Sequence, residues 1–204
     1  MKFQVSAKDK KTLCKQAPEF REVVRRIEFD GFECNGDLFH ALVQSIISQQ
    51  LSIKAADTIY NRVEQLLGTI TAENLKSAAV EDLRACGLSA RKIEYLRGIA
   101  DAVLSGRIDF DALARLPDEE IMKELVKLKG VGEWTAEMLL IFALGRPDVL
   151  SFKDLGIRRG IMLLNKLEEL TEEDFEVYRK RYSPYGTLAS LYLWRIKDGG
   201  LSVK

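Results

Sequence analysis

One carboxylate lies where a helix begins, beside a group of basic residues. Asp154 directly precedes an apolar-periodic segment, so its side chain can cap the N-terminus of that helix. The helix dipole and the nearby Lys153, Arg158 and Arg159 favour its ionised form at neutral pH. A fixed, ionised carboxylate can stabilise a developing positive charge and can also activate water. Without further information, an Asp at this place is more typical of a plain helix cap.

A second feature is the stretch Leu128-Lys129-Gly130-Val131-Gly132-Glu133-Trp134-Thr135-Ala136. Two glycines flank one aliphatic residue between a helix that ends and a helix that begins at once. Glycines at this spacing let the backbone turn tightly and approach another molecule closely. The first N–H groups of the new helix have no partner inside it, so the turn can bind a phosphate through Gly130, Val131, Gly132 and Thr135. The G-x-G fragment alone is as typical of an ordinary turn between two helices.

The elements that must position these residues are helical by pattern. The chain has only 14 Gly and 4 Pro among 204 residues, and its apolar residues recur at helical spacing. Glycines follow the apolar runs, as expected for C-terminal caps, at Gly68, Gly87, Gly106, Gly130 and Gly145. Pro117 with the acids after it, and Thr171 with Asp174, indicate helix starts. We therefore predict an all-α fold with about ten helices from residue 18 onward and an extended stretch at 2–6.

We expect two helical lobes with a cleft between them, which is the natural place for a ligand. One lobe combines residues 1–30 with residues 151–204. The other spans residues 31–150 and ends in the hairpin at about residues 120–145.

Composition excludes several classes of protein. The three cysteines, Cys14, Cys34 and Cys86, share no C-x-x-C spacing, which argues against a zinc site, a disulfide framework or an iron–sulfur cluster and favours a reducing cytosol or nucleus. Neither a secretory signal nor an apolar run long enough to span a bilayer is expected. The 31 basic and 31 acidic residues cancel, which predicts a small phosphate footprint rather than excluding nucleic acid.

Three stretches in collinear order, from about residue 36 to 197, resemble the HhH-GPD DNA glycosylase superfamily. The hairpin is similar to its Leu-Pro-Gly-Val-Gly signature, with Lys129 in place of the Pro. The segment from Gly145 to Asp154 resembles its Gly/Pro-rich loop that ends in an Asp. The run Asp154-Leu155-Gly156 with two arginines after it, and the segment Ser45–Ser52 with its Ile-Ile-Ser-Gln-Gln, are typical of the 3-methyladenine DNA glycosylase II branch.

This resemblance implies a two-lobed helical glycosylase fold and a monofunctional enzyme. Such an enzyme flips an alkylated purine of the 3-methyladenine or 7-methylguanine type out of duplex DNA and hydrolyses its glycosidic bond in base excision repair. Asp154 would be the catalytic residue that stabilises the oxocarbenium-like sugar. Bifunctional relatives carry a nucleophilic Lys two residues past the second hairpin glycine, where this chain has Trp134, so no abasic-site lyase activity is expected.

The resemblance also implies roles for further residues. The base pocket would contain Trp134, Trp194, Met138 and His40, with Met138 at a position that is aromatic in the branch. Gln50, or its neighbour Gln49, would fill the gap left by the flipped base. The backbone carbonyls of Val126, Leu128 and Val131 would bind a structural Na⁺ or K⁺, and no other cofactor is required.

Two other functions stay open at this point. The first is a glycosylase for an oxidised or deaminated base, such as 8-oxoguanine, hypoxanthine or uracil. The second is a non-catalytic DNA-binding protein, which would keep Gly130 and Gly132 but would need neither Asp154 nor Trp134 in a cleft. In every case the expected partner is DNA. For the two enzyme functions, it is double-stranded DNA that carries a damaged base. The chain would act as a monomer, away from membranes, in the cytoplasm (nucleoid) of a prokaryote or the nucleus of a eukaryote.

Overall fold

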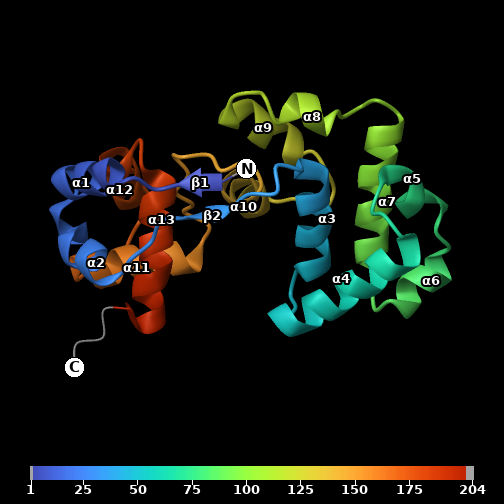
Figure 1. The fold of residues 1–204 in the computed structure, drawn as a ribbon, viewed down its shortest axis with the longest axis horizontal. Coiled ribbons are helices and arrows are strands. Elements are labelled where there is room, and N and C mark those ends of the chain that lie inside the picture. The colour runs from blue at the N-terminus through green and yellow to red at the C-terminus, as the bar shows by residue number, and fades with distance from the viewer. Residues whose placement is uncertain (1, 201–204) are drawn as a thin grey trace. The chain divides into compact units, whose positions relative to one another are not determined.

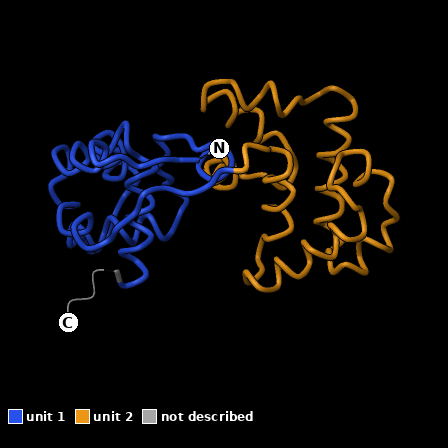
Figure 2. Tube along the Cα trace, in the orientation of Figure 1, with its two compact units in different colours: residues 1–34, 140–204 blue, residues 35–139 orange. Residues whose placement is uncertain are grey.

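The computed structural model describes residues 2–200, and the chain divides into two compact units, which Figure 2 colours separately. Unit 1 consists of residues 1–34 and 140–204, and unit 2 of residues 35–139. The second boundary falls inside helix α10 (Glu133–Phe142). The boundaries expected from the sequence, at 30/31 and 150/151, assign this whole helix and the loop after it to the central lobe. In the structure that loop belongs to unit 1, because Leu150 is part of the unit 1 core.

Unit 1 contains a two-stranded sheet and a group of helices that pack on α13 (Figure 1). Its complete elements are β1 (Lys2–Gln4), α1 (Ala7–Gln16), the 3₁₀ turn η1 (Pro18–Phe20), α2 (Arg21–Arg26), β2 (Gly31–Glu33), α11 (Leu155–Asn165), α12 (Glu172–Tyr182), α13 (Gly186–Arg195) and the turn η2 (Ile196–Gly200). The strands are antiparallel, with Phe3 opposite Phe32, and β1 lies in the predicted extended stretch. Helices α11 and α12 both contact α13, and their shared core includes Phe20, Tyr182 and Tyr192.

Unit 2 is built from helices alone in the part that the structure describes (Figure 1). They are α3 (Leu38–Ser48), α4 (Ile53–Leu67), α5 (Ala72–Ser77), α6 (Val80–Ala85), α7 (Ala90–Leu104), α8 (Phe110–Leu113), α9 (Asp118–Leu125) and the first part of α10. Helix α7 contacts α3, α5 and α6, and α3 also contacts α4. The apolar faces of these helices meet in a core that includes Leu42, Ile46 and Leu96, all fully buried.

The predicted helical class is confirmed, and so are most of the predicted helix ends. All five glycines expected as stop signals have positive φ, from 62° at Gly145 to 105° at Gly87. Thr171 and Asp174 form the expected capping box at the start of α12. The predicted count from residue 18 onward omits α1, although Ser6 and Asp9 form a capping box at its start. Among residues 2–200, no helix has both the length and the apolar character needed to cross a bilayer.

Candidate functional site

Asp154 is held at the N-terminus of α11 by two hydrogen bonds to one oxygen atom. Its Oδ1 accepts the backbone N–H of Ile157 at 2.8 Å, the N-cap bond that the sequence predicts. The same oxygen accepts the indole Nε1–H of Trp194 at 2.9 Å. The side chain is mostly buried, with 9% of the residue exposed. Two donors aimed at one oxygen fix the direction of the carboxyl group, as a charge-stabilising group requires.

Trp194 reaches Asp154 because glycines let α11 and α13 approach closely. A Cβ atom added at Gly156 would lie 2.8 Å from Cδ1 of Trp194 and 3.1 Å from Oδ1 of Asp154. One turn later, a Cβ at Gly160 would lie 2.6 Å from the carbonyl oxygen of Leu193. A larger residue at Gly160 would force the two helices apart, and one at Gly156 would displace the indole of Trp194. The glycines after Asp154 therefore position its indole partner.

The loop that leads to Asp154 is fastened to the start of α13. Asp148 accepts the backbone N–H of Gly186 at 3.0 Å. The Thr187 hydroxyl accepts the backbone N–H of Val149 at 3.1 Å, and the Ser190 hydroxyl donates to the carbonyl of Val149 at 2.9 Å. Trp194 is itself part of α13, and the loop before Asp154 is bonded to the start of the same helix. The loop therefore cannot shift without breaking buried polar contacts.

An aromatic group lies beside the carboxylate within unit 1. Phe142, at the end of α10, stacks on Trp194 with ring centroids 5.7 Å apart and an angle of 21° between the rings. On its other side Phe142 contacts Phe32 of β2 at 5.4 Å. Phe142 is still 46% exposed, so its ring is available for contact with a bound molecule. Sequence reasoning missed this residue, because an aromatic at the end of an apolar helix is usually a core residue.

The other predicted pocket residues lie in unit 2. Trp134 and Met138 are one turn apart on α10, and Trp134 is 43% exposed. His40 lies on α3, where its Nε2 shares a hydrogen bond with the hydroxyl of Tyr60 on α4 and the two rings meet edge to face. Burial raises the pKa of that Tyr60 hydroxyl above its ordinary value. Within unit 2, Tyr60 is thus the described partner of the His40 ring.

The hairpin between α9 and α10 uses its two glycines differently. Gly130 has φ of 91°, and a Cβ there would lie 2.3 Å from Cδ2 of Tyr95 on α7, so no other residue fits. A Cβ at Gly132 would meet nothing within 4 Å, so its surroundings are open to another molecule. The turn is closed by the Val131 N–H, which donates to the Leu128 carbonyl at 3.0 Å. Thr135 is buried in the first turn of α10, and the exposed Lys129 pairs with Glu94.

The two predicted gap-filling residues lie on a tight turn between α3 and α4. Gln49 has φ of −51° and ψ of 129°, Gln50 has φ of 59°, and the Leu51 N–H donates to the Ser48 carbonyl at 3.1 Å. These values are those of a type II β-turn, whose third residue is normally Gly or Asn. Gln49 donates from Nε2 to the carbonyl of Gly130 at 3.0 Å, while Gln50 is exposed. Since Gln49 is engaged with the hairpin, Gln50 is the better candidate for contact with a partner.

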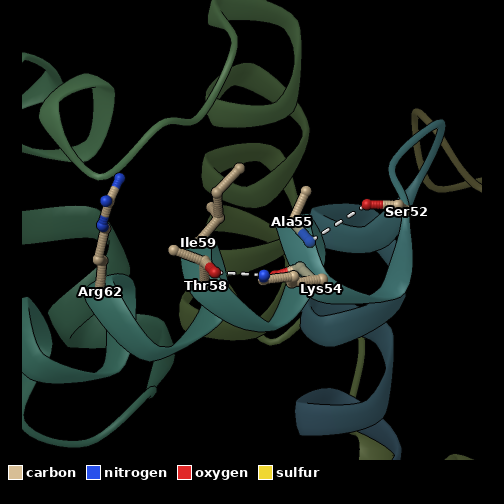
Figure 3. Close-up of a pocket in the computed structure, with 6 residues that line it drawn as sticks. All are labelled: Ser52, Lys54, Ala55, Thr58, Ile59 and Arg62. Carbon is tan, nitrogen blue, oxygen red and sulfur yellow. Dashed lines mark hydrogen bonds between the residues drawn. The ribbon is translucent and has the colours of Figure 1, made fainter.

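A shallow hollow of about 360 Å³ lies along α4, directly after this turn (Figure 3). Its lining includes the N-cap residue Ser52, the hydroxyl of Thr58 and the basic side chains of Lys54 and Arg62. Lys54, Thr58 and Arg62 follow each other at four-residue spacing and therefore share one face of the helix. Lys54, beside the N-terminus of α4, suits an anionic group, and Arg62 adds a second cation about two turns further along the helix. The sequence shows the two basic residues, Lys54 and Arg62, but only the helix register of α4 reveals that they share one face.

Other kinds of reactive centre are not built into the described residues. Among residues 2–200, His, Cys, Asp and Glu side chains form no group able to hold a metal ion. The three cysteines are free, and burial raises the pKa of each thiol, so none is an activated nucleophile. Asp154 is the candidate for chemistry because two donors fix its carboxyl group.

Comparisons with known proteins place the chain in a family. The profile of the HhH-GPD superfamily of base excision DNA repair proteins matches residues 43–184. DNA-3-methyladenine glycosylase 1 of Schizosaccharomyces pombe is 40% identical over 162 residues, which cover 77% of this chain and 71% of that protein.

Two solved structures share the fold over nearly the whole chain. A DNA-3-methyladenine glycosidase from Bacillus halodurans superposes with a TM-score of 0.83 at 39% identity, covering 97% of this chain and 92% of that one. The Schizosaccharomyces pombe 3-methyladenine DNA glycosylase Mag1, solved in complex with abasic DNA, gives a TM-score of 0.79 at 34% identity, covering 94% and 97%.

Proposed function

The chain belongs to the HhH-GPD superfamily of base excision DNA repair proteins, and we propose that it is a monofunctional DNA-3-methyladenine glycosylase with Asp154 as its catalytic carboxylate. The observation that carries the assignment of the residue is the pair of N–H donors that fixes Oδ1 of Asp154. A plain helix cap needs only the first of these donors. The second, from Trp194, gives the carboxylate one direction, which is what a group acting on a bound sugar requires.

The reaction that this carboxylate supports is hydrolysis of an N-glycosidic bond. The bond between C1′ and the alkylated purine breaks, and the base leaves with the bonding electron pair. The sugar becomes oxocarbenium-like, and the negative charge of Asp154 stabilises it. Water then adds to C1′ and loses a proton, which leaves an abasic site in an intact strand. The cationic charge of a 3- or 7-alkylated purine makes it a good leaving group, so no strong general acid is needed.

The absence of lyase chemistry follows from Trp134. This residue occupies the place where bifunctional relatives have a nucleophilic lysine, and an indole cannot form a Schiff base with the sugar. The exposed indole has a different use, because its electron-rich face attracts a cationic base by about 1–2 kcal/mol. Met138, one turn further on α10, supplies a polarisable but non-aromatic contact.

DNA is bound through backbone contacts from unit 2. The hairpin offers the open space at Gly132, at the start of α10, to one phosphate, while the Val131 N–H closes the turn on the Leu128 carbonyl. Gln50 fills the gap that the extruded base leaves, with Gln49 holding the turn against the hairpin. The hollow with Lys54 and Arg62 takes a further phosphate (Figure 3). We propose that the enzyme works as a monomer on genomic DNA, in the nucleoid or the nucleus.

A monovalent cation fits the hairpin by the chemistry of its donors. Backbone carbonyl oxygens are ligands that Na⁺ and K⁺ accept, and Val126, Leu128 and Val131 all belong to the segment between α9 and α10. The Leu128 carbonyl already accepts the Val131 N–H at 3.0 Å and keeps one lone pair. Such an ion would supply positive charge next to a bound phosphate. No cofactor enters the hydrolysis itself.

A panel of lesion duplexes tests the proposal. Duplexes that carry 7-methylguanine, 8-oxoguanine, hypoxanthine or uracil are incubated with the protein, and strand scission is measured with and without hot alkali. We expect scission that depends on the protein only for the alkylated purine and only after alkali. Release of another base instead would contradict the substrate class, and scission without alkali would contradict the assignment of Trp134.

A further inference from the structure

A lysine of α7 holds the turn that carries Gln49 and Gln50. Lys92 donates from Nζ to the carbonyl oxygen of Ile47 at 2.7 Å and to that of Gln49 at 2.8 Å. The Ile47 carbonyl is one of the last in α3, where carbonyl groups lack partners inside the helix and a cation is favoured. Lys92 is partly buried, and this burial lowers the pKa of its amine below the usual value.

The contact with the Gln49 carbonyl is important because of the type of turn. This carbonyl belongs to the peptide group between Gln49 and Gln50, which is the central peptide of the turn. Rotation of that peptide by about half a turn converts a type II into a type I β-turn, in which the third residue has negative φ. Gln50 has φ of 59°, a conformation that a residue with a Cβ keeps only when its surroundings enforce it. Lys92 provides this enforcement, because it binds the carbonyl only in the type II orientation.

The same part of α7 also supports the hairpin. Tyr95, three residues after Lys92, lies directly against Gly130, where an added Cβ would be 2.3 Å from its ring. The Gly130 carbonyl in turn accepts the side-chain amide of Gln49 at 3.0 Å. Lys92 and Tyr95 therefore hold the gap-filling turn and the phosphate-binding hairpin in one fixed arrangement within unit 2.

We propose that Lys92 is a positioning residue for base extrusion. It keeps the central peptide of the Ser48–Leu51 turn in the type II orientation, and so sets the direction from which the Gln50 side chain enters the duplex. This inference rests on the proposed function, since it assigns Lys92 a part in the same reaction. If Lys92 had only a structural role, its replacement would lower the stability of the protein. The rate of base release would then fall equally for paired and unpaired bases.

The test compares two substrates that differ only in the cost of extrusion. Single-turnover release of 7-methylguanine is measured with cytosine opposite the lesion and with an abasic analogue opposite it. Extrusion is less costly when the base has no partner. For Lys92→Met we expect the rate on the paired substrate to fall about tenfold or more, and the rate on the unpaired substrate to fall less than about threefold.

Two further variants control for charge and for stability. Lys76→Met removes another lysine of unit 2, which pairs with Asp101 at 2.6 Å, and should change both rates by less than about threefold. Lys92→Arg keeps donors and charge and should recover part of the paired-substrate rate. If Lys92→Met does not fold, Lys92→Gln, which keeps a single amide donor, is measured in its place. Equal losses on the two substrates, or no loss, would overturn the proposal.

A readout without catalysis separates this inference from the proposed function. 2-Aminopurine placed beside an abasic analogue changes its fluorescence when a side chain fills the gap. The wild type should give this change, and Lys92→Met should not, although it still binds the duplex. If the wild type releases no alkylated base, the proposed function fails, and the fluorescence still decides the role of Lys92. A full fluorescence change with Lys92→Met would refute that role even in an active enzyme.

Discussion

Replacing Trp194 with Phe removes one hydrogen bond from Asp154 and keeps an aromatic ring next to Phe142. The indole Nε1–H donates to Oδ1 of Asp154 at 2.9 Å, while the aromatic system of Trp194 stacks on Phe142. Phe has no donor. Of the two donors that meet at Oδ1, only the Ile157 N–H then remains, at 2.8 Å. The helix cap is preserved, so α11 keeps its start, but the carboxylate loses one of the donors that fix its direction.

The size of the effect follows from the kind of bond that is lost. A hydrogen bond to a charged group contributes about 1.5–3 kcal/mol. If that bond fixes the carboxylate in the transition state, its loss lowers the rate about 10- to 100-fold, at roughly 1.4 kcal/mol for each factor of ten. Affinity for DNA should change little, because Trp194 is assigned no phosphate contact. The loss should therefore lie in the chemical step.

Two assays separate the chemical step from DNA affinity. Single-turnover release of alkylated purines from methylated DNA measures the rate of the chemical step, and fluorescence anisotropy with an abasic duplex measures the affinity. Gly156→Ala is the matched variant, because its Cβ would lie 2.8 Å from Cδ1 of Trp194 and so displace the indole from the same oxygen. Both variants should lose activity with near-normal binding. A Trp194→Phe enzyme with a release rate like that of the wild type would refute the reasoning, and so would a loss that is entirely one of DNA affinity.

Three further results are expected. Gly130→Ala should destabilise the fold by about 1–3 kcal/mol in urea unfolding, because its Cβ meets Tyr95, whereas Gly132→Ala should keep stability within about 1 kcal/mol and weaken DNA binding; equal stability of the two variants would contradict this difference. Tyr192→Phe should leave the free energy of unfolding unchanged or raise it by about 1 kcal/mol, since the buried hydroxyl has no hydrogen-bond partner in the described structure. Burial raises the pKa of Tyr192 to about 12, so the wild type should lose stability as pH rises from the unfolded-state pKa of about 10 towards 12. The Tyr192→Phe variant should lose less stability over this range, and parallel plots of unfolding free energy against pH would contradict the role of this hydroxyl. Replacing Na⁺ and K⁺ by tetramethylammonium at constant ionic strength should weaken DNA binding, and unchanged affinity would argue against the hairpin cation.

The sequence predicted the parts of the fold that depend on local chemistry. Helix ends with glycine, the Thr171 capping box and the cap at Asp154 are set by backbone conformation within a few residues, and each is present. The family resemblance added the order of the signatures and hence the activity. The missed helix α1 had a local signal as well, since Ser6 and Asp9 stand at capping-box spacing. The extended stretch at 2–6 predicted β1, but its pairing with β2 had no local signal, because the partner strand lies far along the chain.

The contacts that complete the site are long-range, and no local pattern predicts them. Trp194 was expected as part of a pocket, but its hydrogen bond to Asp154 depends on the close packing of α11 on α13. Phe142 gains its place from Trp194, which is distant in sequence. Lys92 is one of many lysines in the sequence and is distinguished only by the two carbonyls that its amine reaches. The roles of Gln49 and Gln50 could not be separated until the hydrogen bond to Gly130 engaged the first of them.

The most direct test of the central claim is the Asp154→Asn enzyme. Asn keeps an oxygen that can accept the Ile157 and Trp194 N–H groups, so the fold and the cap should persist while the negative charge is lost. Single-turnover release of alkylated purines should fall about a hundredfold or more, with affinity for an abasic duplex within about threefold of the wild type. A variant that releases the base at the rate of the wild type would contradict the assignment of Asp154 as the catalytic carboxylate.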